Sequence, residues 1–334
     1  MMDALVASED EPDLLQLSGG EPTIHPDIVR ILDMARERPI RHLMINTNGL
    51  RIATDPEFVA ELAARRKGLE IYLQFDSLKP EALVDLRGAD LTKVRRKALE
   101  ALEAANISTT LVCTVKKGVN DDEMAAIIDH ALSFRCVRGV TFQGVQDTGR
   151  NIGFDPRKNR VLLTDIRRRV VEDSGVFGEA DMIPLPCNPT GFSIGYGIRN
   201  GRTVVPVTAM IPKEQLVAEM PNTVNFERYP ALKDRIFELF SLSTIEPNAA
   251  QRMGDLLCCL PQVEIPAGLS YENIFRVVVV NFMDRFNFCV ANVKRSCVHF
   301  VTPAGQLIPF ETYNLFYRDG GVERLRSQAA SAKH

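Results

Sequence analysis

The first part of the chain alternates between short apolar runs and longer segments whose apolar residues recur at helical spacing. The spacing predicts strands over residues 14–17, 42–46, 69–75, 108–115 and 139–143. It predicts helices over residues 26–38, 56–67, 92–105 and 121–134. In the third of these helices, Val94, Ala98, Leu99 and Leu102 form one apolar stripe. Strands that alternate with helices at this spacing indicate repeated βα units around a parallel sheet.

The pattern becomes less regular after residue 150. We expect a basic helix over residues 157–173 and a hairpin over residues 193–207, with its turn at Asn200-Gly201. A helical region is expected over residues 229–260, and a buried strand over residues 275–283. The sequence therefore divides into a repeating βα part at 14–150, a C-terminal appendage at 151–320 and a flexible tail at 327–334.

Length and charge restrict the class of protein. The chain has 334 residues, 45% of them hydrophobic, which is enough for a sizeable core. The formal net charge of −3 gives no basic field, so we expect no nucleic-acid partner. No apolar run approaches the ~20 residues of a membrane span, and the start resembles no signal peptide. We therefore expect a cytoplasmic protein with no transmembrane segment.

The seven cysteines are odd in number and follow no secreted-scaffold spacing, so a disulfide framework is not expected. Cys113 and Cys136 lie in apolar surroundings and are expected to be small core residues. The remaining five are candidates for metal or redox chemistry. They are Cys187, Cys258, Cys259, Cys289 and Cys297. Reduced cysteines that bind no metal remain the alternative.

Polar side chains recur where the predicted strands end. The first strand ends in Ser-Gly-Gly-Glu-Pro at 18–22, and the next ends at Asn46. The third ends with Gln74 and Asp76, and a later strand ends at Gln143. Each of these residues could be part of an ordinary turn or a helix cap. Together, on one edge of a parallel sheet, they indicate a polar ligand site.

These strand ends resemble the radical S-adenosylmethionine (radical SAM) superfamily. The resemblance rests on Ser-Gly-Gly-Glu-Pro at 18–22, Thr-Asn-Gly at 47–49 and Phe-Asp-Ser at 75–77. It implies that the segment Gly19, Gly20, Glu21 and Pro22 receives the methionyl amino group. It further implies that Asn46, Gln74, Asp76 and Gln143 make the other polar contacts to S-adenosylmethionine.

Further segments, from Leu-Arg-Gly at 86–88 to Cys-Val-His at 297–299, resemble one subgroup, over residues 14–318. That subgroup contains tetraether-lipid synthases and dihydropterin methyltransferase-like proteins. The resemblance implies an enzyme that functionalises unactivated C–H bonds, by carbon–carbon coupling or methylation of a lipid or pterin-like substrate. It also implies a [4Fe–4S] cluster, whose reduction of S-adenosylmethionine starts the chemistry, and an electron donor such as a ferredoxin or flavodoxin.

One family feature is missing. The superfamily holds its cluster with Cys-x3-Cys-x2-Cys after the first barrel strand, whereas this sequence has no cysteine before Cys113. We expect a chain whose first βα unit is absent, and the alternative is a non-catalytic relative that binds S-adenosylmethionine or a partner without redox chemistry. The expected fold is α/β: a partial (βα)6-type radical SAM barrel, first strand missing, with a C-terminal α+β appendage. Its first strand would then be an exposed edge, through which the chain could dimerise.

The resemblance also assigns the C-terminal cysteines. Cys187, Cys297 and one or two of Cys258, Cys259 and Cys289 would hold an auxiliary iron–sulfur cluster. Glu311 stands where the subgroup has a further cysteine, and Cys289 is the expected replacement.

Overall fold

A computed structural model describes most of the chain. The described residues are 1–148, 151, 153–185, 188–209, 213–219, 273–322, 324 and 328. The expected helix at 229–260 and the tail at 327–334 lie almost wholly outside them.

The five predicted strands form one parallel sheet. They are β1 (Leu14–Leu17), β2 (His42–Thr47), β3 (Leu69–Gln74), β4 (Thr109–Val115) and β5 (Val137–Gly144), and each pairs in parallel with the next. The predicted βα alternation is therefore confirmed, and with it the α/β class.

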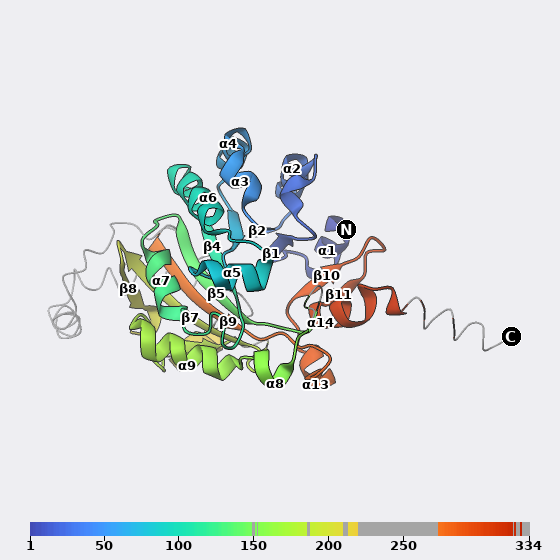
Figure 1. Cartoon of the computed structure of the whole chain (residues 1–334). Helices are drawn as coiled ribbons and strands as arrows, with labels where there is room; N and C mark the ends of the chain where they lie inside the picture. Colours follow the sequence, from blue (N-terminus) through green and yellow to red (C-terminus); the bar gives the residue numbers. More distant parts are fainter. Residues whose placement is uncertain are drawn as a thin grey trace.

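Helices connect these strands and cover one face of the sheet (Figure 1). They are α2 (Ile28–Arg36), α3 (Leu50–Thr54), α4 (Pro56–Ala64), α5 (Pro80–Arg87), α6 (Thr92–Ala104) and α7 (Met124–Leu132), with the 3-10 turn η1 (Pro22–Ile24) after β1. Two short helices, α3 and α5, were missed by the periodicity because each spans too few turns to repeat a stripe. α5 nevertheless carries boundary signals: Pro80 in its first turn and Gly88, in the left-handed region at φ 80°, after its end.

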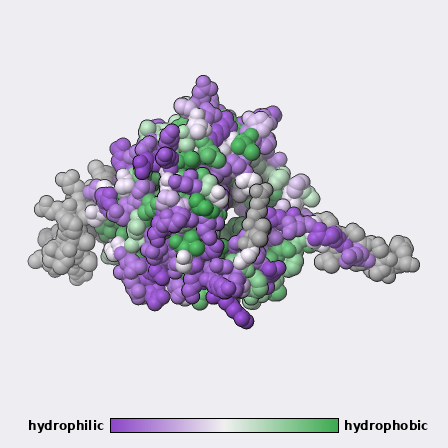
Figure 2. Space-filling model, in the orientation of Figure 1, coloured by the Kyte–Doolittle hydropathy of each residue, from purple (hydrophilic) through white to green (hydrophobic). Residues whose placement is uncertain are grey.

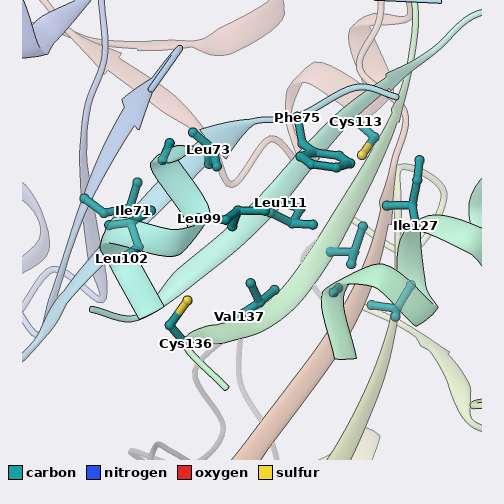
Figure 3. Close-up of a cluster of buried hydrophobic side chains, with 14 of the residues drawn as sticks. Ile71, Leu73, Phe75, Leu99, Leu102, Leu111, Cys113, Ile127, Cys136 and Val137 are labelled. Carbon is teal, nitrogen blue, oxygen red and sulfur yellow. The ribbon is translucent and has the colours of Figure 1, made fainter. Parts of the chain in front are cut away.

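The hydrophobic core lies between this sheet and its helices. Ile71 and Leu73 on β3 are fully buried, and so are Leu99 and Leu102 on α6. Figure 3 shows these side chains gathered with Cys113 and Cys136, both of which are free and buried. The expected core role of the two cysteines is confirmed.

The sheet extends beyond residue 150. β9 (Ile274–Val280) pairs in parallel with β5, and β7 (Phe192–Asn200) runs antiparallel to β9. β6 (Met182–Pro184) and β8 (Thr203–Pro206) both pair with β7, and the expected turn lies at Gly201, with φ 60°. The division at residue 150 stays a prediction, since the hydrogen-bonded sheet continues across it.

The expected helix at 157–173 is interrupted. Its two parts are α8 (Pro156–Asn159) and α9 (Leu163–Ser174), and the residues between them are extended. The break turns Arg160 towards Asp284, to which it donates a hydrogen bond of 2.6 Å. An ion pair with a residue 124 positions away has no signature in local periodicity.

The remaining elements lie at the two chain ends and beside the hairpin. They are α1 (Met2–Glu9), η2 (Val207–Ala209), α10 (Lys213–Glu219), α13 (Val290–Val293), β10 (His299–Val301), β11 (Leu307–Pro309), α14 (Phe310–Thr312) and η5 (Tyr313–Tyr317). β10 and β11 form an antiparallel pair, which lies next to α1 (Figure 1).

β1 lies at one edge of the sheet. Its described partner is β2 alone, and the strand order along the sheet is β1-β2-β3-β4-β5-β9-β7-β6. β1 is therefore an edge strand in the described part of the chain, with all four of its residues half-buried, and the exposure of this edge stays a prediction.

One face of the molecule is predominantly polar. Figure 2 shows a mostly hydrophilic face on which hydrophobic side chains form small separate patches. Among the described residues, no helix combines the length and apolar character needed to cross a membrane.

Candidate functional site

A large cavity of about 1870 Å³ opens on the face of the sheet opposite the hydrophobic core, and residues of α2 and α5 also line it. Side chains alternate along each strand, so that Ile71 and Leu73 face the core while Tyr72 and Gln74 line the cavity. The wall opposite β1–β5 is formed by residues 294–301, 307 and 310, which we call the C-terminal wall.

The glycine pair after β1 lies on the cavity. Both Gly19 and Gly20 are exposed and line it, and an added Cβ at either position would meet no atom within 4 Å. The backbone of this turn is therefore open to a ligand, as the glycine pattern predicts. Pro22 follows as the first residue of η1 and also lines the cavity.

The Glu21 carboxylate accepts hydrogen bonds from neighbouring residues of the protein. Its Oε1 accepts hydrogen bonds from Thr23 N at 3.1 Å and from Thr47 Oγ1 at 2.7 Å. Its Oε2 accepts from Asn48 N at 2.7 Å. Glu21 thus caps η1 and ties the end of β1 to the end of β2. Among the described residues Oε2 accepts this single hydrogen bond, and Glu21 lines the cavity, so both the carboxylate and the carbonyl oxygens of the turn remain candidates to receive an ammonium.

Amide and hydroxyl side chains line the cavity side by side on neighbouring strands. Gln74 Nε2 donates to Asn46 Oδ1 at 3.2 Å, and Gln143 Nε2 donates to Thr114 Oγ1 at 3.1 Å. These four residues, from β2, β3, β4 and β5, are called the amide row below. The sequence predicted three of them, and Thr114 was missed because a threonine inside a strand is unremarkable.

Gln146, two residues beyond β5, is a second residue that the sequence did not single out. Its Nε2 is buried in the wall of the cavity and has no hydrogen-bond partner among the described residues. Buried donors are nearly always paired in folded proteins.

Asp76 lies behind the cavity wall. It is fully buried, and it accepts hydrogen bonds from Arg87 Nε at 2.7 Å and Arg87 Nη2 at 2.8 Å. Arg87 itself lines the cavity, with its side chain 30% exposed. Burial would lower the pKa of Arg87, but Asp76 outweighs it and raises that pKa. The sequence predicted that Asp76 lines the ligand site. In the structure Arg87, at the end of α5, lines the cavity, and Asp76 lies behind it.

A buried charge cluster lies beside the cavity, and two of its members, Thr110 and Arg276, line it. Glu70 accepts hydrogen bonds from Arg276 Nη2 at 3.0 Å and lies 2.8 Å from His42 Nε2. Thr110 also donates to Glu70. Burial alone would raise the pKa of the Glu70 carboxyl, but Arg276 and His42 outweigh it and hold that pKa well below its usual range. We call these four residues the Glu70 cluster; periodicity gave no signal for it, because its members come from four strands.

The C-terminal side of the cavity is aromatic. The rings of Phe282 and Phe310 lie 4.3 Å apart, and those of Phe300 and Phe310 stack at 5.5 Å. All three line the cavity, together with Phe192. The cavity therefore has one polar side, formed by the strand ends, and one apolar side.

The described cysteines do not assemble a metal centre. Cys289 is exposed and free, and Cys297 lies in the C-terminal wall, where it is disulfide-bonded. Cys187, Cys258 and Cys259 lie outside the described residues. No group of three or more His, Cys, Asp or Glu side chains that could hold a metal ion occurs in the described part of the chain.

Comparison with known proteins finds similarity to one family in the first part of this chain. Residues 2–131 match the description "Radical SAM superfamily". A 7,8-dihydro-6-hydroxymethylpterin dimethyltransferase of Methanocaldococcus jannaschii is 28% identical over 93% of this chain, which spans 68% of that relative's length.

Other matches cover less of the chain. A GTP 3′,8-cyclase of Mycobacterium bovis is 29% identical over 40% of this chain and 36% of its own length. Among solved structures, a domain of pyruvate-formate lyase-activating enzyme from Bacteroides vulgatus covers 48% of this chain and 92% of that domain, with a TM-score of 0.38 and 16% identity.

Proposed function

We propose that this chain, whose residues 2–131 match the radical SAM superfamily, binds S-adenosylmethionine in its cavity and acts on an unactivated C–H bond of a small substrate. Members of the superfamily use S-adenosylmethionine with a [4Fe–4S] cluster, and the matching relatives are enzymes. The observation that carries the proposal is the exposed backbone of Gly19-Gly20 beside the amide row on one cavity.

The groups that line the cavity fit this cofactor. The carbonyl oxygens of the glycine turn accept an ammonium group, and the amide row offers donors and acceptors for ribose hydroxyls. The unpaired Gln146 Nε2 offers one more donor. Bound S-adenosylmethionine supplies, once reduced, the group that takes hydrogen from a C–H bond. The protein's part is to hold it, orient it and exclude water.

The primary cluster does not fit the described residues. A [4Fe–4S] cluster needs thiolate ligands, and in the described part of the chain Cys297 is the one cysteine on the cavity and is disulfide-bonded. This supports a second proposal, that the described part of the chain binds S-adenosylmethionine without redox chemistry of its own.

The proposed substrate class rests on the resemblance to the subgroup of tetraether-lipid synthases and dihydropterin methyltransferase-like proteins. The relative from Methanocaldococcus jannaschii is named for the methylation of a pterin, and the subgroup also contains lipid-coupling enzymes. The aromatic side of the cavity suits the apolar or planar part of either substrate. Methylation or carbon–carbon coupling of a pterin-like or lipid substrate is therefore the proposed reaction.

Iron reconstitution under anaerobic conditions tests the two proposals against each other. Once the Cys297 disulfide is reduced, we expect the chain to bind at most an auxiliary cluster, so that Cys187→Ala and Cys297→Ala each lower bound iron while Cys113→Ala does not. Reductive cleavage of S-adenosylmethionine by the chain alone would show that a primary cluster does form. If the iron content is unchanged in both the Cys187→Ala and the Cys297→Ala variants, these two cysteines bind no iron and have structural roles only.

The proposed functions also imply two partners, an electron donor and a second copy of this chain. A redox-active form would need an electron donor such as a ferredoxin or flavodoxin. The open edge of β1 suits pairing with a second copy, so size-exclusion chromatography should show a dimer. A monomer at all concentrations would contradict that interface.

A further inference from the structure

Exposed hydrophobic side chains gather on the surface around the start of α13. Phe286, Val290 and Phe316 expose 50%, 61% and 42% of their area. The ring of Phe316 packs edge to face on that of Phe288 at 5.4 Å, and Phe288 lies two residues from both Phe286 and Val290. An exposed apolar group of this kind marks an interaction site more often than single exposed residues do. We call these four residues the apolar patch.

Two arginines flank the apolar patch without giving it net charge. The guanidinium of Arg285 lies 4.9 Å from the centre of the Phe286 ring, and that of Arg160 lies 6.0 Å from it. Arg285 forms an ion pair with Asp147, and Arg160 forms one with the buried Asp284. These two arginines therefore pack against the patch but have carboxylates of their own.

The net positive charge beside the patch comes from Lys294 and Arg295, which directly follow α13. Both side chains are exposed, and neither forms an ion pair within the described part of the chain. Residues 285–310 contain no Asp or Glu, although the whole chain has 43 of them and a net charge of −3. The surface around the patch is therefore basic on a chain that is acidic overall.

Lys294 and Arg295 also connect the patch to the cavity. Lys294 lies one helical turn from Val290, whose carbonyl oxygen accepts a hydrogen bond from the Lys294 backbone N–H at 3.1 Å. Both cations line the cavity, as do Phe300 and Phe310 on its aromatic side. Because the two cations are exposed as well, they lie where this side of the cavity meets the surface.

We propose that the apolar patch, with Lys294 and Arg295, binds the surface of a membrane that contains anionic lipids. Aromatic and aliphatic side chains enter the boundary between headgroups and acyl chains, while cations remain at the lipid phosphates. An acidic protein would match the charges, but it gives no reason for the aromatic side of the cavity to open at this point. A membrane gives one, because an apolar molecule can pass from it into the cavity. The inference concerns a surface outside the cofactor site.

Vesicle sedimentation of the full chain tests the charge requirement. The probes are vesicles of phosphatidylcholine alone and vesicles in which about one third of the lipid is phosphatidylglycerol. We expect binding to the anionic vesicles and at least ~10-fold weaker binding to the neutral ones. The double variant Lys294→Gln with Arg295→Gln should weaken binding to the anionic vesicles ~10- to 50-fold, because both cations lie at the surface.

The matched control removes two cations from another surface. Arg96 and Lys97 on α6 are also adjacent and exposed, and neither forms an ion pair in the part of the chain that the structure describes. Arg96→Gln with Lys97→Gln changes the net charge by the same amount. It should leave binding to the anionic vesicles within about twofold, because charges distant from the bound membrane are screened by salt.

A tryptophan reporter tests whether the patch enters the membrane. The chain contains no tryptophan, so the fluorescence of a single introduced one reports on its own position. Val290→Trp places it in the patch, and Val84→Trp places it on α5, where Val84 is half exposed. Anionic vesicles should shift the emission of Val290→Trp to shorter wavelength, and brominated lipid should quench it at least ~twofold. The emission of Val84→Trp should stay unchanged.

Each contrary result overturns the inference. If the unaltered chain does not bind anionic vesicles at low salt, the patch serves another partner, such as an acidic protein. If the two double variants lose the same affinity, the attraction is not specific to this surface. If the chain binds vesicles and the emission of Val290→Trp does not change, the patch stays outside the membrane. Calorimetric titration with S-adenosylmethionine tests the proposed function separately, so its failure is distinguishable from the failure of this inference.

Discussion

At the scale of single residues, the polar groups at the strand ends divide into two sets. Glu21 lines the cavity with Asn46, Gln74 and Gln143, whereas Asp76 is fully buried behind its wall. Both carboxylates accept hydrogen bonds from protein donors and so help to shape the site. A buried charge that is fully hydrogen-bonded is expected to be rigid and costly to remove.

The glycine turn gives the first prediction. At Gly20 an added Cβ would meet no protein atom within 4 Å and would project into the space that a ligand needs. Gly20→Ala should therefore leave the free energy of unfolding within about 0.5 kcal/mol. The same variant should weaken S-adenosylmethionine binding at least tenfold in a calorimetric titration. An affinity equal to that of the unaltered chain would show that the ligand does not approach this turn.

The cysteines give a second prediction. Burial raises the pKa of the Cys113 thiol, and burial likewise raises that of Cys136, whereas Cys289 is exposed. Iodoacetamide reacts with thiolates, so in the native protein it should label Cys289 and spare the two buried thiols. Peptide mass spectrometry gives the labelled fraction at each position. Labelling of Cys113 as fast as Cys289 would contradict its placement in the core.

The sequence could predict which strand ends are polar, but not which side chains reach the cavity. Residues 74 and 76 differ by two positions, so simple alternation would put both on the same face. The backbone leaves the strand after Gln74, and the positive φ of Asp76 directs its side chain to Arg87 instead. Arg87 itself lies on a short helix without a long stripe, and its exposure is ordinary for an arginine.

At the scale of elements, local patterns determine the βα part well. The stripe on α6 and the apolar runs of β2 to β5 each depend on neighbours a few residues away. β9 could be predicted as a strand, but its parallel place beside β5 depends on a partner more than 130 positions away. The pairing register of two strands that are far apart in the sequence cannot be predicted from either strand alone.

The contact between β5 and β9 gives the third prediction. An added Cβ at Gly139 would lie 2.6 Å from the carbonyl oxygen of Arg276, which is backbone and cannot move alone. Gly139→Ala should therefore cost about 1–3 kcal/mol in urea unfolding, as overpacking generally does. Gly19→Ala is the matched control, because its Cβ would meet no atom within 4 Å. If the two variants are equally stable, the close contact between β5 and β9 at Gly139 is absent.

At the scale of the whole molecule, the Glu70 cluster joins distant strands across the curved sheet. Glu70 is on β3 and Arg276 is on β9, and β4 and β5 lie between them in the sheet. Their side chains meet because the sheet curves around the cavity. The pair therefore fixes the curvature of a barrel whose strands do not close on themselves within the described residues.

Breaking this pair gives the fourth prediction. Glu70→Gln leaves Arg276 buried without its carboxylate, which typically costs about 3–5 kcal/mol. Urea unfolding at pH 7 measures the loss. Adding Arg276→Met to Glu70→Gln should recover part of it, because the uncompensated charge is then gone. A double variant no more stable than Glu70→Gln would show that the charge is not the cause.

The Glu70 carboxylate also makes the free energy of unfolding depend on pH. The pKa of Glu70 is lower in the folded protein than the ordinary value of about 4.3, so its contribution is complete above that value. The contribution is lost as the pH falls through ~4 towards the depressed folded-state pKa. The stability difference between the unaltered chain and Glu70→Gln should therefore shrink as the pH falls from 6 to 3.

The central claim is that the cavity holds S-adenosylmethionine between the glycine turn and the amide row. The most direct measurement is a crystal structure of the chain grown with that ligand. We predict the methionyl amino group within hydrogen-bond distance of the carbonyl oxygens of the Gly19-Gly20 turn, and the ribose beside Gln74 and Gln143. A ligand bound outside this cavity, or crystals in which the cavity holds no ligand at saturating concentration, would contradict the account.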